Sequence, residues 1–124
     1  MVVIERLIFD DVIEGTTDVY TDPKLNAELG SPNKFTLVGF ASQSSGTSPT
    51  LTVQAEVSVG DERYWSNLQG TPEINGTALS TTVRTSFGST PNIESSTGRM
   101  RFRLALGGTA PKSRVQLYFT GRDP

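Results

Sequence analysis

The chain has 124 residues, a length that suits one domain, so we predict a single domain over residues 1–124. It contains neither cysteine nor histidine, which excludes disulfides, thiolate chemistry, imidazole general bases and most transition-metal sites. The formal net charge of −2 argues against nucleic acid as a partner, because binding to phosphates needs a basic surface.

Residues 2–9, VVIERLIF, are apolar on both alternating faces, apart from Glu5 and Arg6. This pattern predicts a strand that is covered on both sides, either within its own sheet or as an arm exchanged with another chain. The apolar run is too short, and charge interrupts it too soon, for a signal peptide or a membrane span. We therefore expect a soluble protein without a membrane partner.

Acidic residues dominate the next segment, from Asp10 to Asp22. Carboxylates could collect calcium here, because the ligands of calcium are oxygen atoms. The alternate acids around a central glycine that an EF-hand loop needs are missing, so we predict a solvated acidic loop, with a short extended piece over 16–20.

Residues 22–30 carry a helical pattern, in which Asp22 can cap, Pro23 suits the first position and Gly30 ends one or two turns. Residues 33–41 then predict a strand. A change of its apolar face near Gly39 indicates either a bulge or burial on both sides.

Residues 50–59 alternate strictly between apolar and polar side chains, which predicts a long strand with one buried face. Glycine and proline in the preceding GTSP segment predict a turn, and Gly60-Asp61 predicts the next one. Short strands over 63–68 and 78–87 follow, separated by a loop over 69–76, and residues 88–98 form a long polar loop.

The segment from Ser45 to Trp65 resembles one found in small bacteriophage virion proteins. There, a Ser-Gly-Thr-Ser-Pro-Thr-Leu turn leads into a strand, which is followed by a Ser-x-Asp-Gly-like turn and a tryptophan. Residues 45–51 match the first part, and Ser58, Asp61 and Trp65 stand where the second part would be, with glycine and aspartate in reverse order. The resemblance covers about a sixth of the chain.

The last two predicted strands are residues 99–106 and 112–120, which read as a β-hairpin around a turn over 107–111. Low hydrophobic content, plentiful Gly, Thr, Ser and Pro and recurrent β-branched residues favour short strands joined by tight turns. We predict an all-β fold, an antiparallel β-sandwich, with the jelly roll of about eight strands as first choice. The expected core residues are Val53, Val57, Val83, Phe102, Leu104, Leu117 and Phe119.

Catalytic groups are not evident. Two carboxylates can hydrolyse a glycoside, but nothing in the spacing of Asp10, Asp11, Glu56 and Asp61 favours this, so we predict no enzyme, no cofactor and no metal site. Tyr64 and Trp65, with Tyr20 or Tyr118, suggest a sugar-stacking platform. The alternative is that one aromatic residue fills the core while its neighbour lies at the rim.

Alternation places three arginines on one outer face of the strand over 99–106, where they repel one another unless they are matched. Acidic side chains on a neighbouring strand, the acidic first thirty residues of another copy, or solvent alone could match them. If this row and the first strand contact other chains, the candidate interface residues are Val2, Ile4, Arg6, Arg99, Arg101 and Arg103.

The resemblance to virion proteins implies a capsid decoration or cement protein of a bacteriophage, which binds the outer surface of the head without catalysis. It further implies the major capsid protein and other copies of the chain, as a homotrimer, as partners. The chain would then lie on the capsid surface after assembly in the host cytoplasm. The alternatives are a tail, neck or fibre-associated virion protein and a carbohydrate-binding β-sandwich module.

Overall fold

The computed structural model describes residues 3–21, 34–59, 64–89, 93–94 and 99–122. Within these ranges every regular element is a strand, and the strands pair with one another in antiparallel fashion. The strands are β1 (Val3–Glu14), β2 (Val19–Tyr20), β3 (Lys34–Val59), β4 (Tyr64–Asn67), β5 (Ile74–Ala78), β6 (Thr85–Gly88), β7 (Ile93–Glu94) and β8 (Arg99–Arg122). The helix predicted over 22–30 lies outside the described residues.

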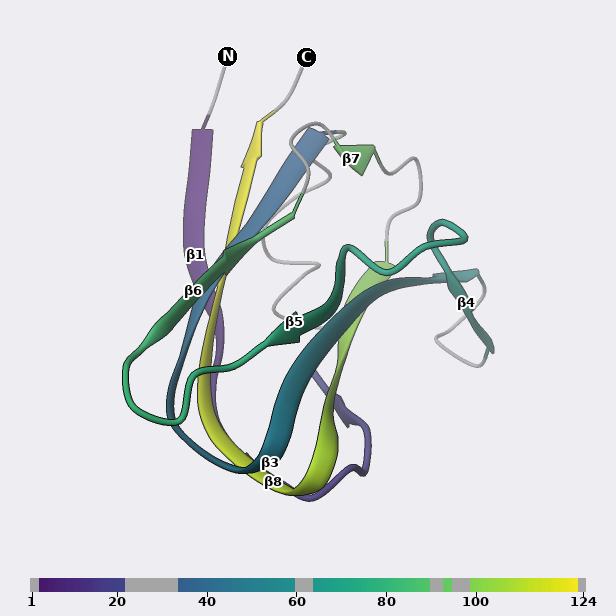
Figure 1. The fold of residues 1–124 in the computed structure, drawn as a ribbon. Coiled ribbons are helices and arrows are strands. Elements are labelled where there is room, and N and C mark those ends of the chain that lie inside the picture. The colour runs from purple at the N-terminus through teal and green to yellow at the C-terminus, as the bar shows by residue number, and fades with distance from the viewer. Residues whose placement is uncertain (1–2, 22–33, 60–63, 90–92, 95–98, 123–124) are drawn as a thin grey trace.

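Two long strands, β3 and β8, run side by side through a sharp corner and so belong to two layers (Figure 1). We define the first and second arms of β3 as residues 34–45 and 50–59, and those of β8 as residues 99–107 and 112–122. The β1 layer has the order β1, second arm of β8, first arm of β3, β6. The β2 layer has the order β2, first arm of β8, second arm of β3, β5.

This order is that of a jelly roll. β4 and β5 pair in succession along the second arm of β3, and β6 and β7 along the first, so each couple is one interrupted strand. With the arms counted as strands in chain order, strands 1-8-3-6 face strands 2-7-4-5, which is the double Greek key of a jelly roll. The predicted antiparallel sandwich is therefore confirmed.

The hairpin predicted for residues 99–120 is wrong. Both arms of β8 pair with β3, from Ser58↔Arg99 to Lys34↔Arg122, and they lie in different layers. The turn predicted before residue 50 is likewise a corner inside one strand. At both places the backbone changes direction through residues with positive φ, but the strand continues on the other layer.

The corner depends on two glycines with positive φ, Gly46 and Gly108. A Cβ at Gly46 would lie 2.7 Å from the carbonyl oxygens of Thr109 and Ala110, and one at Gly108 would lie 2.6 Å from those of Thr47 and Ser48. The two strands β3 and β8 therefore cross the corner in direct backbone contact, which only glycine permits. Beside the corner the buried Ser44 and Ser113 hydroxyls share a hydrogen bond of 2.8 Å.

The core lies between the layers. Phe102 and Phe119, from the two arms of β8, meet across it with ring centroids 6.2 Å apart. The β1 layer contributes Ile8, Ile13, Leu37, Ala41, Phe87, Val115, Leu117 and Phe119, and the β2 layer contributes Leu51, Val53, Ala55, Ile74, Met100, Phe102, Leu104 and Leu106. Of the predicted core residues, Val57 is partly buried against this cluster.

Val83 is the predicted core residue that the structure contradicts, since it is 68% exposed. Residues 78–87 do not form one strand: β5 ends at Ala78, a turn follows, and β6 begins at Thr85. The Ser80 hydroxyl accepts from the N–H groups of Thr82 and Val83, so local hydrogen bonds hold the turn and point Val83 outward.

The first strand is an edge strand in the described sheet, paired with β8 alone. A bulge between Leu7 and Phe9 shifts its register by one residue. Ile8 and Ile13 face the core, whereas Leu7 and Val12 are exposed, so the part of the chain that the structure describes leaves the second apolar face of β1 partly open. No helix in the described ranges is long and apolar enough to cross a membrane.

Candidate functional site

The strand register gathers a polar and aromatic group on the outer face of the β2 layer. Glu56 lies directly opposite Arg101, Tyr20 opposite Arg103, and Trp65 opposite Ser58, so all of these side chains point to the same face. We name Tyr20, Glu56, Trp65, Arg101 and Arg103 the arginine cluster.

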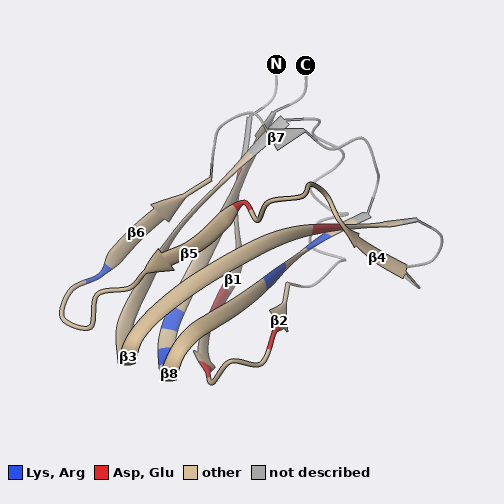
Figure 2. Cartoon of the chain, turned by 45° about the vertical axis from the view of Figure 1, so that its right-hand side comes forward, with Lys and Arg blue, Asp and Glu red and all other residues tan. Residues whose placement is uncertain are grey.

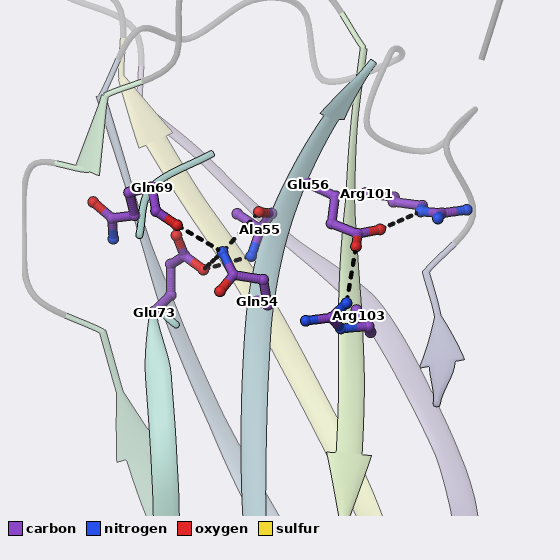
Figure 3. A network of polar contacts seen from close by, with 7 residues as sticks. All are labelled: Gln54, Ala55, Glu56, Gln69, Glu73, Arg101 and Arg103. Atoms are coloured by element: carbon purple, nitrogen blue, oxygen red, sulfur yellow. Dashed lines mark hydrogen bonds and ion pairs between the residues drawn. The ribbon is translucent and has the colours of Figure 1, made fainter. Parts of the chain in front are cut away.

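One carboxylate holds both described arginines of the row (Figure 3). Arg101 Nε–H donates to Glu56 Oε1 at 2.7 Å, and Arg103 Nη1–H donates to Glu56 Oε2 at 3.3 Å. The Glu56 side chain is 7% exposed, against 21% for Arg101 and 34% for Arg103. Two guanidiniums on one buried carboxylate compensate its desolvation, so the arginines are matched within the chain.

Aromatic rings complete the surroundings of Arg101. Its guanidinium carbon lies 4.0 Å from the centroid of the Tyr20 ring and 4.3 Å from that of the Trp65 ring. Such cation–π contacts add attraction and restrict the side chain. Because Tyr20 and Trp65 both present a ring face to Arg101, the aromatic pair serves an internal contact.

The residues of the hypothetical sugar platform are spread over the molecule. Tyr64 and Trp65 follow each other in β4 and so point to opposite faces, with Tyr64 71% exposed. Tyr118 lies in the β1 layer, on the second arm of β8. Trp65 is half-buried at the rim and is not in the core cluster, so neither alternative of the sequence analysis describes it fully.

A second polar group, which no pattern in the sequence predicts, lies at the interruption between β4 and β5. The Ala55 N–H has no strand neighbour at this point and donates to Glu73 Oε2, to which Gln54 Nε2 also donates at 3.4 Å (Figure 3). The Ala55 carbonyl accepts from the Leu68 N–H at 2.9 Å. The Glu73 carboxyl thus replaces the missing ladder partner of a buried amide.

Burial raises the pKa of Glu73, although the hydrogen bond from the Ala55 amide opposes the shift. Glu73 Oε1 is buried without a hydrogen-bond partner. In either protonation state Oε2 remains an acceptor for the Ala55 N–H, whereas the desolvation of the buried carboxyl is greater when it is ionised.

An ion pair joins the acidic N-terminal part of the chain to its basic C-terminal part. Arg114 Nε–H and Nη2–H donate to the two carboxylate oxygens of Asp10 at 3.1 and 3.2 Å, on the outer face of the β1 layer. Figure 2 shows basic positions on β8 and acidic positions on β1, which are neighbouring strands. These hydrogen bonds lower the pKa of Asp10. Asp11 accepts from the Val12 N–H, and no group of three or more Asp or Glu in the described ranges could hold a metal ion.

The candidate interface residues that the structure describes lie in strands of two different layers. Val2 lies outside the described residues, and the structure describes the backbone alone of Ile4 and Arg99. Ile4 and Arg6 belong to β1 and oppose the second arm of β8, whereas Arg99, Arg101 and Arg103 lie on its first arm, in the other layer. Their role as contacts stays a prediction.

Comparison with known proteins gives a structural likeness only. No family model and no curated protein sequence matches the chain. A mutant VP2 protein of infectious bursal disease virus, described as derived T=1 particles, superposes with a TM-score of 0.52 at 13% identity over 97% of this chain. The structure of the Gx strain of that virus gives 0.50 at 12% identity over 95% of this chain.

Both neighbours are viral capsid proteins, and the chain spans 31% of the length of each. At such low identity the likeness shows a shared fold. The described chain is therefore one jelly-roll unit of the kind that these larger proteins also contain.

Proposed function

We propose that the chain is a structural component of a virus particle, specifically a bacteriophage capsid decoration or cement protein that acts without catalysis. The observation that carries the proposal is the jelly roll, which matches part of a viral capsid protein over 97% of this chain. The resemblance of residues 45–65 to phage virion proteins points the same way, from the sequence and not from the fold.

The polar groups of the molecule also suit a structural role. Glu56 is engaged by two arginines, and Glu73 by a backbone amide, so each buried carboxyl has a structural task. The sequence offers no histidine or cysteine beside them. Both carboxyl groups therefore stabilise strands of the sandwich.

The proposed partners are the major capsid protein of a phage head and further copies of the chain, for which the resemblance implies a homotrimer. The proposed location is the capsid surface, after assembly in the host cytoplasm. Of the candidate interface residues, Arg103 offers the most accessible described guanidinium of its row. Repeated weak contacts on a lattice give useful avidity from a small surface per copy.

Virions with and without the protein test the role. We expect particles that lack it to lose DNA at lower temperature and lower salt than complete particles, and added protein to restore resistance. Gold labelling of a tagged chain should mark the head. Labelling confined to the tail would instead support the tail, neck or fibre alternative, and full resistance without the protein would exclude a cement role.

Arg103→Glu tests the arginine row as the shell contact. We expect weaker binding to bare capsids, because the reversed charge opposes the surface that attracts the arginine, and added salt should weaken the wild-type binding in the same way. Thr81→Glu, a change of an exposed residue in the β5–β6 turn, is the control. Equal binding by the two variants would remove the row from the interface.

A further inference from the structure

The outer face of the β1 layer carries an apolar row that the described residues do not cover. Leu7, Tyr118 and Val38 lie opposite one another on β1, β8 and β3. Leu7 is 39% and Val38 38% exposed. Phe40, on the next outward position of β3, meets Tyr118 edge to face with centroids 6.4 Å apart. We name Leu7, Val38, Phe40 and Tyr118 the apolar face.

The charged side chains around the apolar face already have partners within the chain. The Asp10 carboxylate is matched by Arg114, and the Arg84 guanidinium lies 4.3 Å from the centroid of the Phe40 ring. A partner that covers this face therefore does not bury an unmatched Asp10 or Arg114 charge, which would cost more than the apolar contact returns. Adjacent exposed apolar side chains with a polar rim are typical of a protein contact.

The other outer face of the sandwich differs. The corresponding strands of the β2 layer present the guanidiniums of Arg101 and Arg103, which cover the buried Glu56 carboxylate through the hydrogen bonds described above. The molecule is thus asymmetric, with one charged outer face and one apolar outer face, although both are the outward sides of antiparallel layers.

We propose that the apolar face binds the same face of a second copy of this chain, through a two-fold axis that runs along the strands between β8 and β3. This axis sets Tyr118 of one copy on Val38 of the other, and Val38 on Tyr118, which is the reciprocity of an isologous interface. It also sets Leu7 near the position of Gly88, which lies beside Val38 on β6 and has no side chain.

Charge complementarity selects a second copy as the occupant. The axis carries Arg84, which lies over Phe40, onto Gln116 and toward β1 of the second copy. There the exposed Asp11 and Glu14 add to the Asp10 carboxylate that Arg114 already binds, so that a cation meets an acidic strand edge in both directions. Two layers with the same right-handed twist can stack about 10 Å apart with their strands nearly aligned. The contact concerns the purified chain alone and does not depend on the proposed role in the virus particle.

The mass of the protein in solution tests the contact. The two-fold arrangement produces a dimer, in place of the homotrimer that the resemblance to phage proteins implies. We expect light scattering over a range of concentrations to show monomers that associate to twice the mass of the chain. A monomer at every accessible concentration, or a trimer, would overturn the proposal.

Val38→Lys places a charge at the centre of the apolar face, and we expect it to remain monomeric at concentrations where the wild type is a dimer. Tyr64→Lys makes the same kind of change at a residue that is more exposed but belongs to the β2 layer, and this variant should still dimerise. Circular dichroism reports whether each variant is folded. A folded Val38→Lys dimer would show that another surface joins the copies.

Cross-linking gives a readout that does not depend on weakened binding. The chain has no cysteine, so an engineered thiol reacts alone. A mixture of Val38→Cys and Tyr118→Cys proteins should form mixed disulfide dimers under mild oxidation, in clear excess over a mixture of Val38→Cys and Tyr64→Cys. Equal yields from the two mixtures would refute the two-fold contact.

Discussion

Burial raises the pKa of the Glu73 carboxyl, at the interruption between β4 and β5, above the ordinary value of 4.5. A raised pKa means that the folded state holds the proton more tightly than the unfolded state. The corresponding stability is complete below the ordinary pKa of glutamate and is lost as the pH rises through the folded-state pKa. The unfolding free energy should therefore fall as the pH rises above about 4.5.

Glu73→Gln removes this titration and keeps an oxygen acceptor for the Ala55 N–H, so we expect its urea-unfolding free energy to lack that decline and to equal or exceed the wild-type value at neutral pH. Glu73→Ala leaves the buried amide unsatisfied and should cost about 1–3 kcal/mol. If Glu73→Gln were as destabilising as Glu73→Ala at neutral pH, the ionised carboxylate would be the stabilising form.

The two arginines on Glu56 should differ in their contribution to stability. Arg101 has the shorter bond and two aromatic neighbours, and its removal leaves Glu56 with the bond of 3.3 Å from Arg103 alone. We expect Arg101→Ala to lower the unfolding free energy by about 2–3 kcal/mol, as for a charge-assisted bond, and Arg103→Ala to lower it clearly less. Chemical unfolding measures both losses. A larger loss of unfolding free energy in Arg103→Ala than in Arg101→Ala would contradict the stronger role of Arg101.

At the scale of the elements, the corner of β3 and β8 depends on close backbone contact. Gly108→Ala adds a Cβ that would lie 2.6 Å from two carbonyl oxygens, at a residue with a φ of 102°. We expect a loss of stability above the roughly 1 kcal/mol typical of an unfavourable backbone conformation, because the clash adds to the strain. Gly70→Ala is the control, since a Cβ there meets nothing within 4 Å, and thermal melting should place it close to wild type.

The sequence predicted which residues face the core better than it predicted how strands connect. Alternation identified Val53, Phe102 and Leu117 because a period of two reports the face directly. It could not distinguish the residue 107–111 corner from a hairpin turn, because both need glycine and positive φ. Only the pairing of both arms with β3 shows that the strand continues.

The sequence predicted the arginines of the candidate site but not their partner. The arginine row on one face follows from alternation, but its partner Glu56 follows from a register that pairs residues 45 positions apart. Gln54, Glu56 and Ser58 were expected in solvent and are buried, because side chains and segments from other parts of the chain cover the outer face of β3. Long-range cover of this kind leaves no periodic signal in the covered strand.

For the whole molecule, the long β3–β8 ladder predicts slow folding. Its pairs run from Ser58↔Arg99 to Lys34↔Arg122, so every pair closes a large loop before it contributes stability. We expect refolding in roughly milliseconds to seconds, as for other folds rich in distant contacts. Stopped-flow fluorescence of Trp65, the one tryptophan in the chain, can follow refolding, with double-jump experiments to separate proline isomerisation. Refolding in microseconds would contradict the expected dependence on distant contacts.

The pairing of Val3 with Arg122 has a mechanical consequence. These two residues lie at the same end of neighbouring antiparallel strands, so a tensile load applied between them acts across the β1–β8 ladder and opens its hydrogen bonds one after another. Because Arg122 also pairs with Lys34 of β3, the same load acts on the end of the β3–β8 ladder, and both ladders are opened from their ends. Tension between other points, such as the two arms of β3, would instead shear many hydrogen bonds together and meet far greater resistance.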